Sequence, residues 1–325
     1  IVKHEGEGTI IELLDFIEDE KNISKVAGDE PMKGLPSSQE DDIEGDERTD
    51  AESGEMRHGG IGLAQGRAKP VEIELLDFLE DGKNISKIAG IVYKGSEGDI
   101  QETPAREPYP IDELPLPARH LLPIEHYKKR RAKNSWSRTP ALTIYTSRAC
   151  PFGCKFCNLF LVWGRKWRGR SAKLVVDEMQ HIVETYGVNR ILIQDSNFGT
   201  RKKRVEDICD EIIRRGLKID WYTEPGYMLS LLNEKLLVKL RAAGMYQITA
   251  QVESGLPKTL QWMKKPLDLD HARKMLNTAN RLGMMMSSNV IIGFKDETRD
   301  DIEESIRNVE NLHFDHLGYI TPEPL

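Results

Sequence analysis

The chain has 325 residues, a net charge of −7, 39% hydrophobic residues and 30% charged residues. No stretch approaches the roughly 20 apolar residues that cross a bilayer, so we expect no membrane span. Four cysteines are too few for a disulfide scaffold. The net acidity argues against a protein that coats nucleic acid. Because the first residue is Ile1 rather than Met, we expect a processed product or a fragment.

An acidic section dominates the charge of the N-terminal third. Residues 29–56 carry eleven Asp and Glu against Lys33 and Arg48, a local charge of −9 that leaves about +2 for the rest of the chain. The section has few large apolar residues and cannot bury enough surface to offset the entropy of ordering. We therefore predict a disordered acidic linker over residues 29–70; an acidic interaction tail is the alternative.

Two near-copies of one segment flank this linker. Residues 11–28 recur as residues 73–90, with 15 of 18 positions identical. The apolar spacing predicts a short helix in each copy, and two copies are too few for a solenoid, so a duplication is the simplest account. Six prolines between positions 104 and 123 then predict an extended connector. We interpret residues 71–140 as a duplicated helix segment followed by a Pro-rich connector.

From residue 141 to residue 325, short β-rich runs alternate with helical patterns. The expected strands are residues 142–147, 191–194, 218–223, 246–252, 287–293 and 316–320. Glycines that close the helices before the next strand are Gly187, Gly216, Gly244 and Gly283, and the expected N-caps are Asn233 and Thr298. Repeated βα units imply a parallel sheet with right-handed crossovers. Since an eight-unit barrel needs about 250 residues, we predict an α/β fold of the partial (β/α)6 TIM type.

Three of the four cysteines, Cys150, Cys154 and Cys157, lie within eight residues after the first expected strand. Parallel α/β folds place their chemistry at this end of the strands. A single zinc ion would require a fourth ligand from a second CxxC pair or paired histidines, and Cys209 lies on an apolar helical face, where we expect a core residue. Three thiolates suit a four-iron cluster with one open iron. A structural zinc site or an incidental cluster of cysteines is the alternative.

The C-x3-C-x2-C spacing, with Phe156 before the last cysteine, resembles the signature of the radical S-adenosylmethionine (AdoMet, SAM) superfamily. The resemblance covers residues 142–325. It implies a [4Fe–4S] cluster on the three cysteines, with AdoMet chelating the open iron and splitting reductively into methionine and a 5′-deoxyadenosyl radical. It also implies a low-potential electron donor of the flavodoxin or ferredoxin type. No catalytic residue is expected beyond the cluster.

The resemblance further implies which residues contact AdoMet. Phe156 would lie along the adenine. After the second strand, Asp195 would contact the amino group, although Ser196 replaces the second Asp that many relatives have. A helix-cap role is the alternative for Asp195. After the third strand, Glu224 occupies the approximate place of an AdoMet-contacting acid.

The fourth strand ends in Glu253-Ser254-Gly255, which is similar to the ESG motif that reaches the ribose or amino group of AdoMet in the family. A carboxylate that closes an apolar run needs a partner, and a ligand hydroxyl or ammonium provides one. Lys265 matches the basic position that pairs with the AdoMet carboxylate. An ordinary exposed helix lysine is the alternative.

The fifth strand and its loop resemble the family's IIGFPGET sequence. Asn289 falls where relatives often place a ribose-binding residue. Gly293 lets the backbone approach the adenine. Lys295 and Asp296 replace the usual Pro-Gly of the family, which leaves the geometry of this loop open.

The flanking sequence resembles the cobalamin-associated group of the superfamily. Residues 90–100 and 112–127 are similar to the connector of that group, and residues 1–28 to the last βα unit of its cobalamin-binding domain. This resemblance makes cobalamin a candidate cofactor. The Asp-x-His-x-x-Gly loop of the cobalamin-binding domain is absent from this chain, so that domain is incomplete here. We expect a cytoplasmic, oxygen-sensitive methyltransferase. The alternatives are a radical cyclase or other non-methylating enzyme, and a catalytically silent, truncated iron–sulfur protein.

A basic run with interleaved tryptophans, residues 163–170, follows the cysteines. It could meet an anionic small-molecule substrate or offset the negative charge of a cluster. Basic residues with aromatic residues between them also occur on RNA-binding surfaces. Similar sequence occurs in small-molecule members of the superfamily, so we expect no nucleic-acid partner.

Overall fold

The computed structural model describes residues 85–95, 98–106, 108–134, 139–265, 267–294 and 296–321. The chain divides into two compact units, residues 1–106 and 107–325. The predicted cobalamin-domain remnant at residues 1–28, the predicted acidic linker at residues 29–70 and the first part of the second repeat copy lie outside the described residues.

The described part of the first unit is a short hairpin with its own small core. The 3-10 turn η1 (Ile85–Lys87) precedes β1 (Val92–Lys94), which pairs antiparallel with β2 (Ile100–Glu102). The Thr103 hydroxyl bonds the backbone of Ile91 in both directions, accepting from the nitrogen at 3.0 Å and donating to the oxygen at 3.2 Å. Ile88 and Ile91 are buried together beside these elements. The end of the second repeat copy therefore forms a turn that leads into this hairpin.

The second unit begins with the Pro-rich connector. It contains two 3-10 turns, η2 (Ile111–Glu113) and η3 (Arg119–Leu121), and then the helix α4 (Ile124–Asn134). The extended-connector prediction did not include α4. This helix forms because no Pro or Gly interrupts residues 124–134, directly after the last proline of the run.

A parallel sheet forms the centre of the second unit. Its strands are β3 (Ala141–Ile144), β6 (Arg190–Ile193), β7 (Asp220–Thr223), β8 (Gln247–Glu253), β9 (Met285–Ile291) and β10 (His316–Ile320). The first three pair in chain order, and so do the last three. Parallel bridges from Trp221 to Met245 and from Tyr227 to Ala250 join the two halves. Within the described residues the strand order therefore follows the chain, as the partial-barrel prediction requires.

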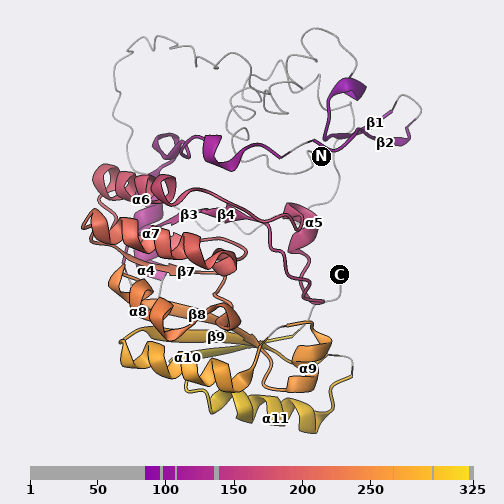
Figure 1. Ribbon diagram of the computed structural model, residues 1–325. Coiled ribbons are helices and arrows are strands. Elements are labelled where there is room, and N and C mark those ends of the chain that lie inside the picture. Colours follow the sequence, from indigo (N-terminus) through magenta and orange to yellow (C-terminus); the bar gives the residue numbers. More distant parts are fainter. Residues whose placement is uncertain are drawn as a thin grey trace, which may run out of the picture. The chain divides into compact units, whose positions relative to one another are not determined.

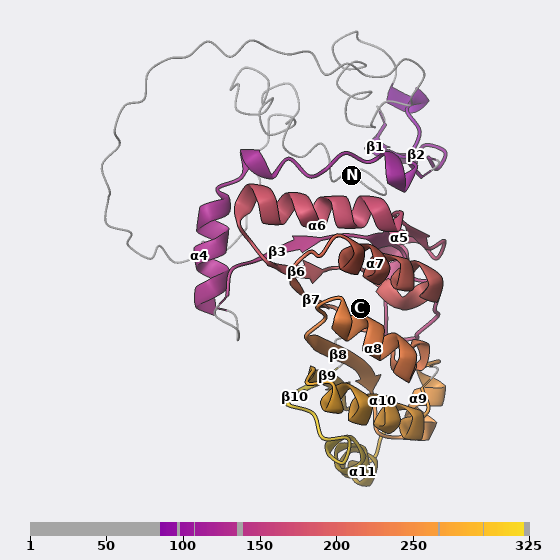
Figure 2. The ribbon, with the colours of Figure 1, turned by 60° about the vertical axis from the view of Figure 1, so that its left-hand side comes forward.

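Most of the helices that connect these strands follow one another along the sheet in the order of the chain, whereas the short helix Pro257–Trp262 lies beside the helix that comes after it (Figures 1 and 2). They are α6 (Ala172–Tyr186), α7 (Lys202–Arg214), α8 (Glu234–Ala242), α9 (Pro257–Trp262), α10 (Leu269–Arg281) and α11 (Arg299–Glu310). Gly187 ends α6 in the left-handed conformation. Asn233 accepts a hydrogen bond from the Leu236 nitrogen, and Thr298 forms a capping box with Asp301. These predicted helix ends are confirmed.

The core lies between the helices and one face of the sheet. In β8 every second residue is buried, so Ile248, Ala250 and Val252 face the helices. The intervening polar residues Gln247 and Thr249 lie on the opposite face because strand side chains alternate. Cys209 of α7 is fully buried in this core, which confirms the core prediction. The helices thus cover one side of the sheet, and polar side chains remain available on the other.

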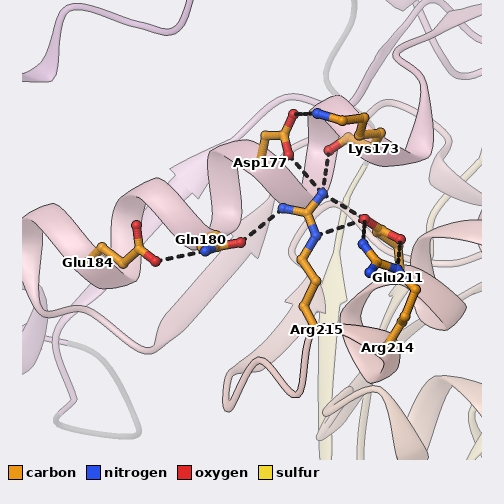
Figure 3. A network of polar contacts seen from close by, with 7 residues as sticks. All are labelled: Lys173, Asp177, Gln180, Glu184, Glu211, Arg214 and Arg215. Atoms are coloured by element: carbon orange, nitrogen blue, oxygen red, sulfur yellow. Dashed lines mark hydrogen bonds and ion pairs between the residues drawn. The ribbon is translucent and has the colours of Figure 1, made fainter.

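A polar network joins the outer surfaces of α6 and α7 (Figure 3). Arg215 donates to Gln180 and Asp177 of α6, at 2.9 and 2.7 Å, and to Glu211 of α7 at 2.7 Å. Hydrogen bonds from Arg214 and Arg215 lower the pKa of Glu211 to about 2. These contacts fix two neighbouring connecting helices side by side.

No described helix combines the length and the apolar character that crossing a membrane requires.

Candidate active site

The three cysteines lie in the loop that follows β3. Two residues of this loop, β4 (Ser147–Arg148), pair antiparallel with β5 (Arg168–Gly169). Ala149 is fully buried with a φ of +67°, a conformation that non-glycine residues rarely adopt, and the chain turns there into Cys150. All four cysteines are free thiols; Cys150, Cys154 and Cys157 are half-buried. The cysteine motif therefore lies at the carboxyl end of the first strand, where the sequence predicted it.

The cysteine loop is attached to the segment that follows β8. The Lys155 nitrogen donates to the Met263 oxygen at 2.9 Å, and the Lys155 ammonium lies 4.9 Å from the centre of the Trp262 ring. Phe152 O accepts a hydrogen bond from Arg165 at 2.7 Å. The two contacts of Lys155 bring residues more than 100 positions apart in the sequence to one end of the sheet.

The electrostatic surroundings of Cys154 show which charged groups meet there. Burial raises the pKa of the Cys154 thiol, the Lys265 ammonium opposes this rise, and Cys150, Cys157 and Glu253 add to it. Lys265 Nζ bonds Glu253 Oε1 at 2.9 Å, with side chains only 4% and 14% exposed. The alternative of an ordinary exposed helix lysine is therefore wrong, because Lys265 is buried in the turn after α9.

Glu253 and Ser254 end β8 in an irregular conformation. Glu253 has a φ of +67°, and the β8–β9 register shifts between Ala250 and Glu253. Ser254 is fully buried, and its hydroxyl lies 3.3 Å from that of Ser305 in α11. The Ser305 hydroxyl also accepts from the Gly255 nitrogen at 2.8 Å. The motif thus presents the Glu253 carboxylate toward Lys265, whereas the Ser254 hydroxyl contacts α11.

Asp195 lies beside the cysteine loop but faces the protein interior. It is fully buried, and its carboxylate accepts hydrogen bonds from the Thr146 nitrogen at 2.6 Å and from the Ser147 hydroxyl at 2.6 Å. Burial raises the pKa of Asp195, which the bonds from Ser147 and Thr146 and the charge of Arg204 oppose. These donors come from the cysteine loop rather than from a helix end.

The remaining predicted AdoMet residues are spread over three strand ends. Gln194 donates to the Glu224 carboxylate, which places Glu224 beside the loop after β6. Phe156 is half-buried, and Asn289 is exposed on β9. Gly293 has a φ of +88°, and its nitrogen donates to Glu297 at 2.9 Å. The backbone conformation at Gly293 is thus one that favours glycine.

Two polar residues near the cysteines were not predicted. Asn197 is 4% exposed, and its side-chain nitrogen lies 3.8 Å from Cys150 Sγ. Arg204 donates to the Thr146 oxygen at 2.6 Å. Asn197 follows Asp195 by two positions, so the polar run after the second strand carried a signal. Arg204 carried none, because it resembles any charged residue on the first turn of a helix.

The basic run contributes mostly internal contacts. Arg165 donates to Phe152 O, Arg168 donates to Tyr109 O at 3.2 Å, and Arg170 pairs with the buried Glu178. The Trp167 ring lies under the Arg201 and Arg204 guanidinium groups, at 5.3 and 5.6 Å. These side chains fasten the segment after the cysteines to its neighbours.

The donor set fits an iron–sulfur cluster. Three free, half-buried thiols adjoin a buried ammonium group, and an amide N–H donor lies near one sulfur. Iron–sulfur clusters are held by cysteine thiolates and tuned by hydrogen bonds to sulfur. Among the described residues, no three His, Cys, Asp or Glu side chains already surround a single metal-sized position. The thiols are therefore gathered at one place without being preset around a single ion.

Comparison with known proteins identifies the family. The model of the radical SAM superfamily matches residues 144–309. An uncharacterized methyltransferase of Pyrococcus horikoshii is 31% identical over 77% of this chain and 53% of its own length. The cytidylyl-2-hydroxyethylphosphonate methyltransferase of Streptomyces wedmorensis is 31% identical over 66% of this chain and 42% of its length. The anaerobic magnesium-protoporphyrin IX monomethyl ester cyclase of Rubrivivax gelatinosus is 25% identical over 81% of this chain and 47% of its own length.

Solved structures show the same fold. The cobalamin- and [4Fe–4S]-bound radical SAM methyltransferase TsrM of Kitasatospora setae aligns with a TM-score of 0.63 and 17% identity, over 77% of this chain and 50% of that chain. The cobalamin-dependent radical enzyme OxsB aligns with a TM-score of 0.63 and 22% identity, over 74% and 34%. The chain thus spans about half the length of the curated relatives it matches. It belongs to the radical SAM superfamily of enzymes.

Proposed function

We propose that this chain is the core of a cobalamin-associated radical SAM methyltransferase and that it holds a [4Fe–4S] cluster on Cys150, Cys154 and Cys157. The observation that carries the proposal is the attachment of the loop of these free thiols, through the Lys155–Met263 hydrogen bond, to the segment that holds the buried Lys265–Glu253 pair. When bound and reduced, such a cluster supplies the electron that splits AdoMet into methionine and a 5′-deoxyadenosyl radical.

The charged pair matches the charges of the methionine end of AdoMet. The Lys265 ammonium complements the AdoMet carboxylate, and the Glu253 carboxylate complements its ammonium or a ribose hydroxyl. Both groups are largely buried beside Cys154, where water screens charges weakly. An electrostatic contact there orients AdoMet without mobile side chains.

We assign the other AdoMet contacts by position. Phe156 lies along the adenine, Gly293 admits it against the backbone, and Asn289 bonds the ribose. Glu224 is the acid at the third strand end. The Ser254 hydroxyl contacts α11, so its part in AdoMet binding is to support the Glu253 turn.

The names of the relatives support methyl transfer, and cobalamin bound by TsrM and OxsB supports the vitamin as methyl carrier. A radical cyclase is the second candidate, supported by the cyclase among the relatives. The electron donor in this proposal is a flavodoxin- or ferredoxin-type protein.

Product analysis distinguishes the two candidates. The chain is reconstituted anaerobically with iron, sulfide and hydroxocobalamin, reduced, and supplied with AdoMet. Transfer of the methyl group to reduced cobalamin leaves S-adenosylhomocysteine, so that product and methylcobalamin are expected. Formation of 5′-deoxyadenosine and methionine without either of these would favour the non-methylating enzyme.

A further inference from the structure

The loop after β6 holds the backbone that leads into Cys150. The Asp195 carboxylate accepts from the Thr146 nitrogen at 2.6 Å, from the Thr146 hydroxyl at 2.5 Å and from the Ser147 hydroxyl at 2.6 Å. Thr146 and Ser147 precede the fully buried turn at Ala149. One buried carboxylate thus fixes the loop a few residues before the first cysteine.

Helix α7 holds the same backbone from a second direction. Arg204 donates to the Thr146 oxygen and to the Arg170 oxygen, both at 2.6 Å. The Arg170 nitrogen donates to the Thr146 oxygen at 2.9 Å. A buried carboxylate is tolerated only with a nearby charge and satisfied hydrogen bonds, and Arg204 supplies the charge. Thr146 is therefore fixed at its nitrogen, its hydroxyl and its oxygen.

Asn197, two residues after Asp195, contacts the side chain of Cys150 itself. Its side-chain nitrogen lies 3.8 Å from Cys150 Sγ and 3.0 Å from Met228 Sδ. Its backbone oxygen accepts from Trp167 Nε1 and from the Thr200 hydroxyl, each at 3.1 Å. The residue is 4% exposed, so its amide group lies among sulfur atoms and away from solvent.

We propose that Asp195 and Asn197 are positioning residues for Cys150, Asp195 by fixing the backbone before it and Asn197 by donating an N–H to its sulfur. The inference rests on the proposed cluster. Outer contacts of this kind orient metal ligands, and N–H donors to sulfur raise a cluster's reduction potential because they stabilise its more negative reduced form. The loop after β6 thereby sets both where Cys150 lies and how readily the cluster accepts an electron.

The potential of the reconstituted cluster tests the role of Asn197. Asn197→Leu keeps the size of the side chain and removes the donor, so a normal iron content with a more negative midpoint potential is expected. Asn277→Leu, on the exposed face of α10, is the control and leaves the potential unchanged. If Asn197→Leu does not fold or load, Asn197→Met, which also lacks a donor and adds no charge, is measured in its place, with the same shift expected. An unchanged potential in the loaded variant overturns the role of Asn197.

The rate at which a chelator removes iron tests the role of Asp195. Asp195→Asn preserves the shape of the side chain, but its NH2 group is a donor and would face the Thr146 and Ser147 donors that now bond the carboxylate. We therefore expect iron loss about tenfold faster than in the parent chain. Asp220→Asn is the matched control, because Asp220 begins β7 and so lies at the end of the sheet opposite to the cysteines. Equal rates for Asp195→Asn and the parent chain contradict the inference. A parent chain that binds no cluster would instead overturn the proposed function.

Discussion

Lys265 Nζ lies 2.9 Å from Glu253 Oε1, and both side chains are largely buried beside Cys154. Lys265 lies in the turn three residues after the end of α9, and Glu253 ends the strand before that helix. One βα unit thus supplies both charges of a pair that faces the cysteines. Because a pair of this kind is costly to desolvate, it is weak evidence for stability and better evidence for a binding role.

Lys265→Met should weaken AdoMet binding by about tenfold or more, since one charge-assisted bond is worth about 1.5–3 kcal/mol. It should also lower the free energy of unfolding by about 3 kcal/mol, because Glu253 is left buried without its partner. Isothermal titration with AdoMet and urea unfolding measure the two effects. The control is Lys239→Met, whose pair with Asp210 is more exposed and should change neither quantity much. Equal effects of the two substitutions would refute the assignment.

Gly255→Ala should disrupt the Glu253-Ser254-Gly255 turn. A Cβ at Gly255 would lie 2.2 Å from the Ser305 backbone oxygen, so α11 would have to move. We expect a loss of about 1–3 kcal/mol in the free energy of unfolding. Gly153→Ala in the cysteine loop, whose Cβ would approach no atom closer than 3.7 Å, should stay within about 0.5 kcal/mol. Urea unfolding of both variants measures the difference, and similar values would contradict the packing described for the turn.

Acid should weaken the contact between α6 and α7 shown in Figure 3. Hydrogen bonds from Arg214 and Arg215 lower the pKa of Glu211 to about 2 from its usual 4.5. A depressed pKa contributes stability that is complete above the unfolded-state value and is lost as the pH falls from about 4.5 toward 2. Glu211→Gln should therefore flatten the fall of the unfolding free energy in this interval. Glu184→Gln, at the far end of the network, is the control, and identical pH profiles for parent and Glu211→Gln would exclude the effect.

Cys209 should behave differently from the three loop cysteines. It is fully buried in α7, and burial raises its pKa to about 12. Cys209→Ser places an unpaired hydroxyl in the core and should cost about 1–3 kcal/mol of unfolding free energy. The iron content after reconstitution should stay normal. Loss of iron in Cys209→Ser at temperatures where the chain remains folded would show that the ligand set is wrong.

The sequence predicted the sheet well because its signals are local. Polar and apolar residues alternate along residues 247–253, which is typical of a half-buried strand and predicts β8. The side chains of Asn233 and Thr298 cap the helices that they precede, which is also a local signal. The helix α4 was missed because the prolines before it dominated the pattern. Local signals therefore predicted the type and order of the elements in the sheet well, but they did not predict where the connector ends and α4 begins.

The place of the cysteine motif in the fold was predicted, but the orientation of Asp195 was not. The cysteine spacing is a local signal, whereas the direction of the Asp195 carboxylate depends on Thr146 and Ser147, nearly 50 residues away. The resemblance assigned Lys265 a binding role, but the sequence did not predict its burial, because nothing in its neighbourhood reveals that Lys264, with a φ of +56°, turns the chain inward. Such tertiary contacts have no periodic pattern in a single sequence.

AdoMet cleavage by the reconstituted chain tests the central claim most directly. The parent chain and Cys154→Ala are loaded anaerobically with iron and sulfide, reduced with dithionite and incubated with AdoMet, and 5′-deoxyadenosine and S-adenosylhomocysteine are quantified. We predict cluster formation and 5′-deoxyadenosine in the parent chain, and neither in Cys154→Ala; S-adenosylhomocysteine is expected only when hydroxocobalamin is added. A parent chain that retains zinc and leaves AdoMet intact, or a Cys154→Ala variant as active as the parent, would contradict the assignment of these cysteines to a radical SAM cluster.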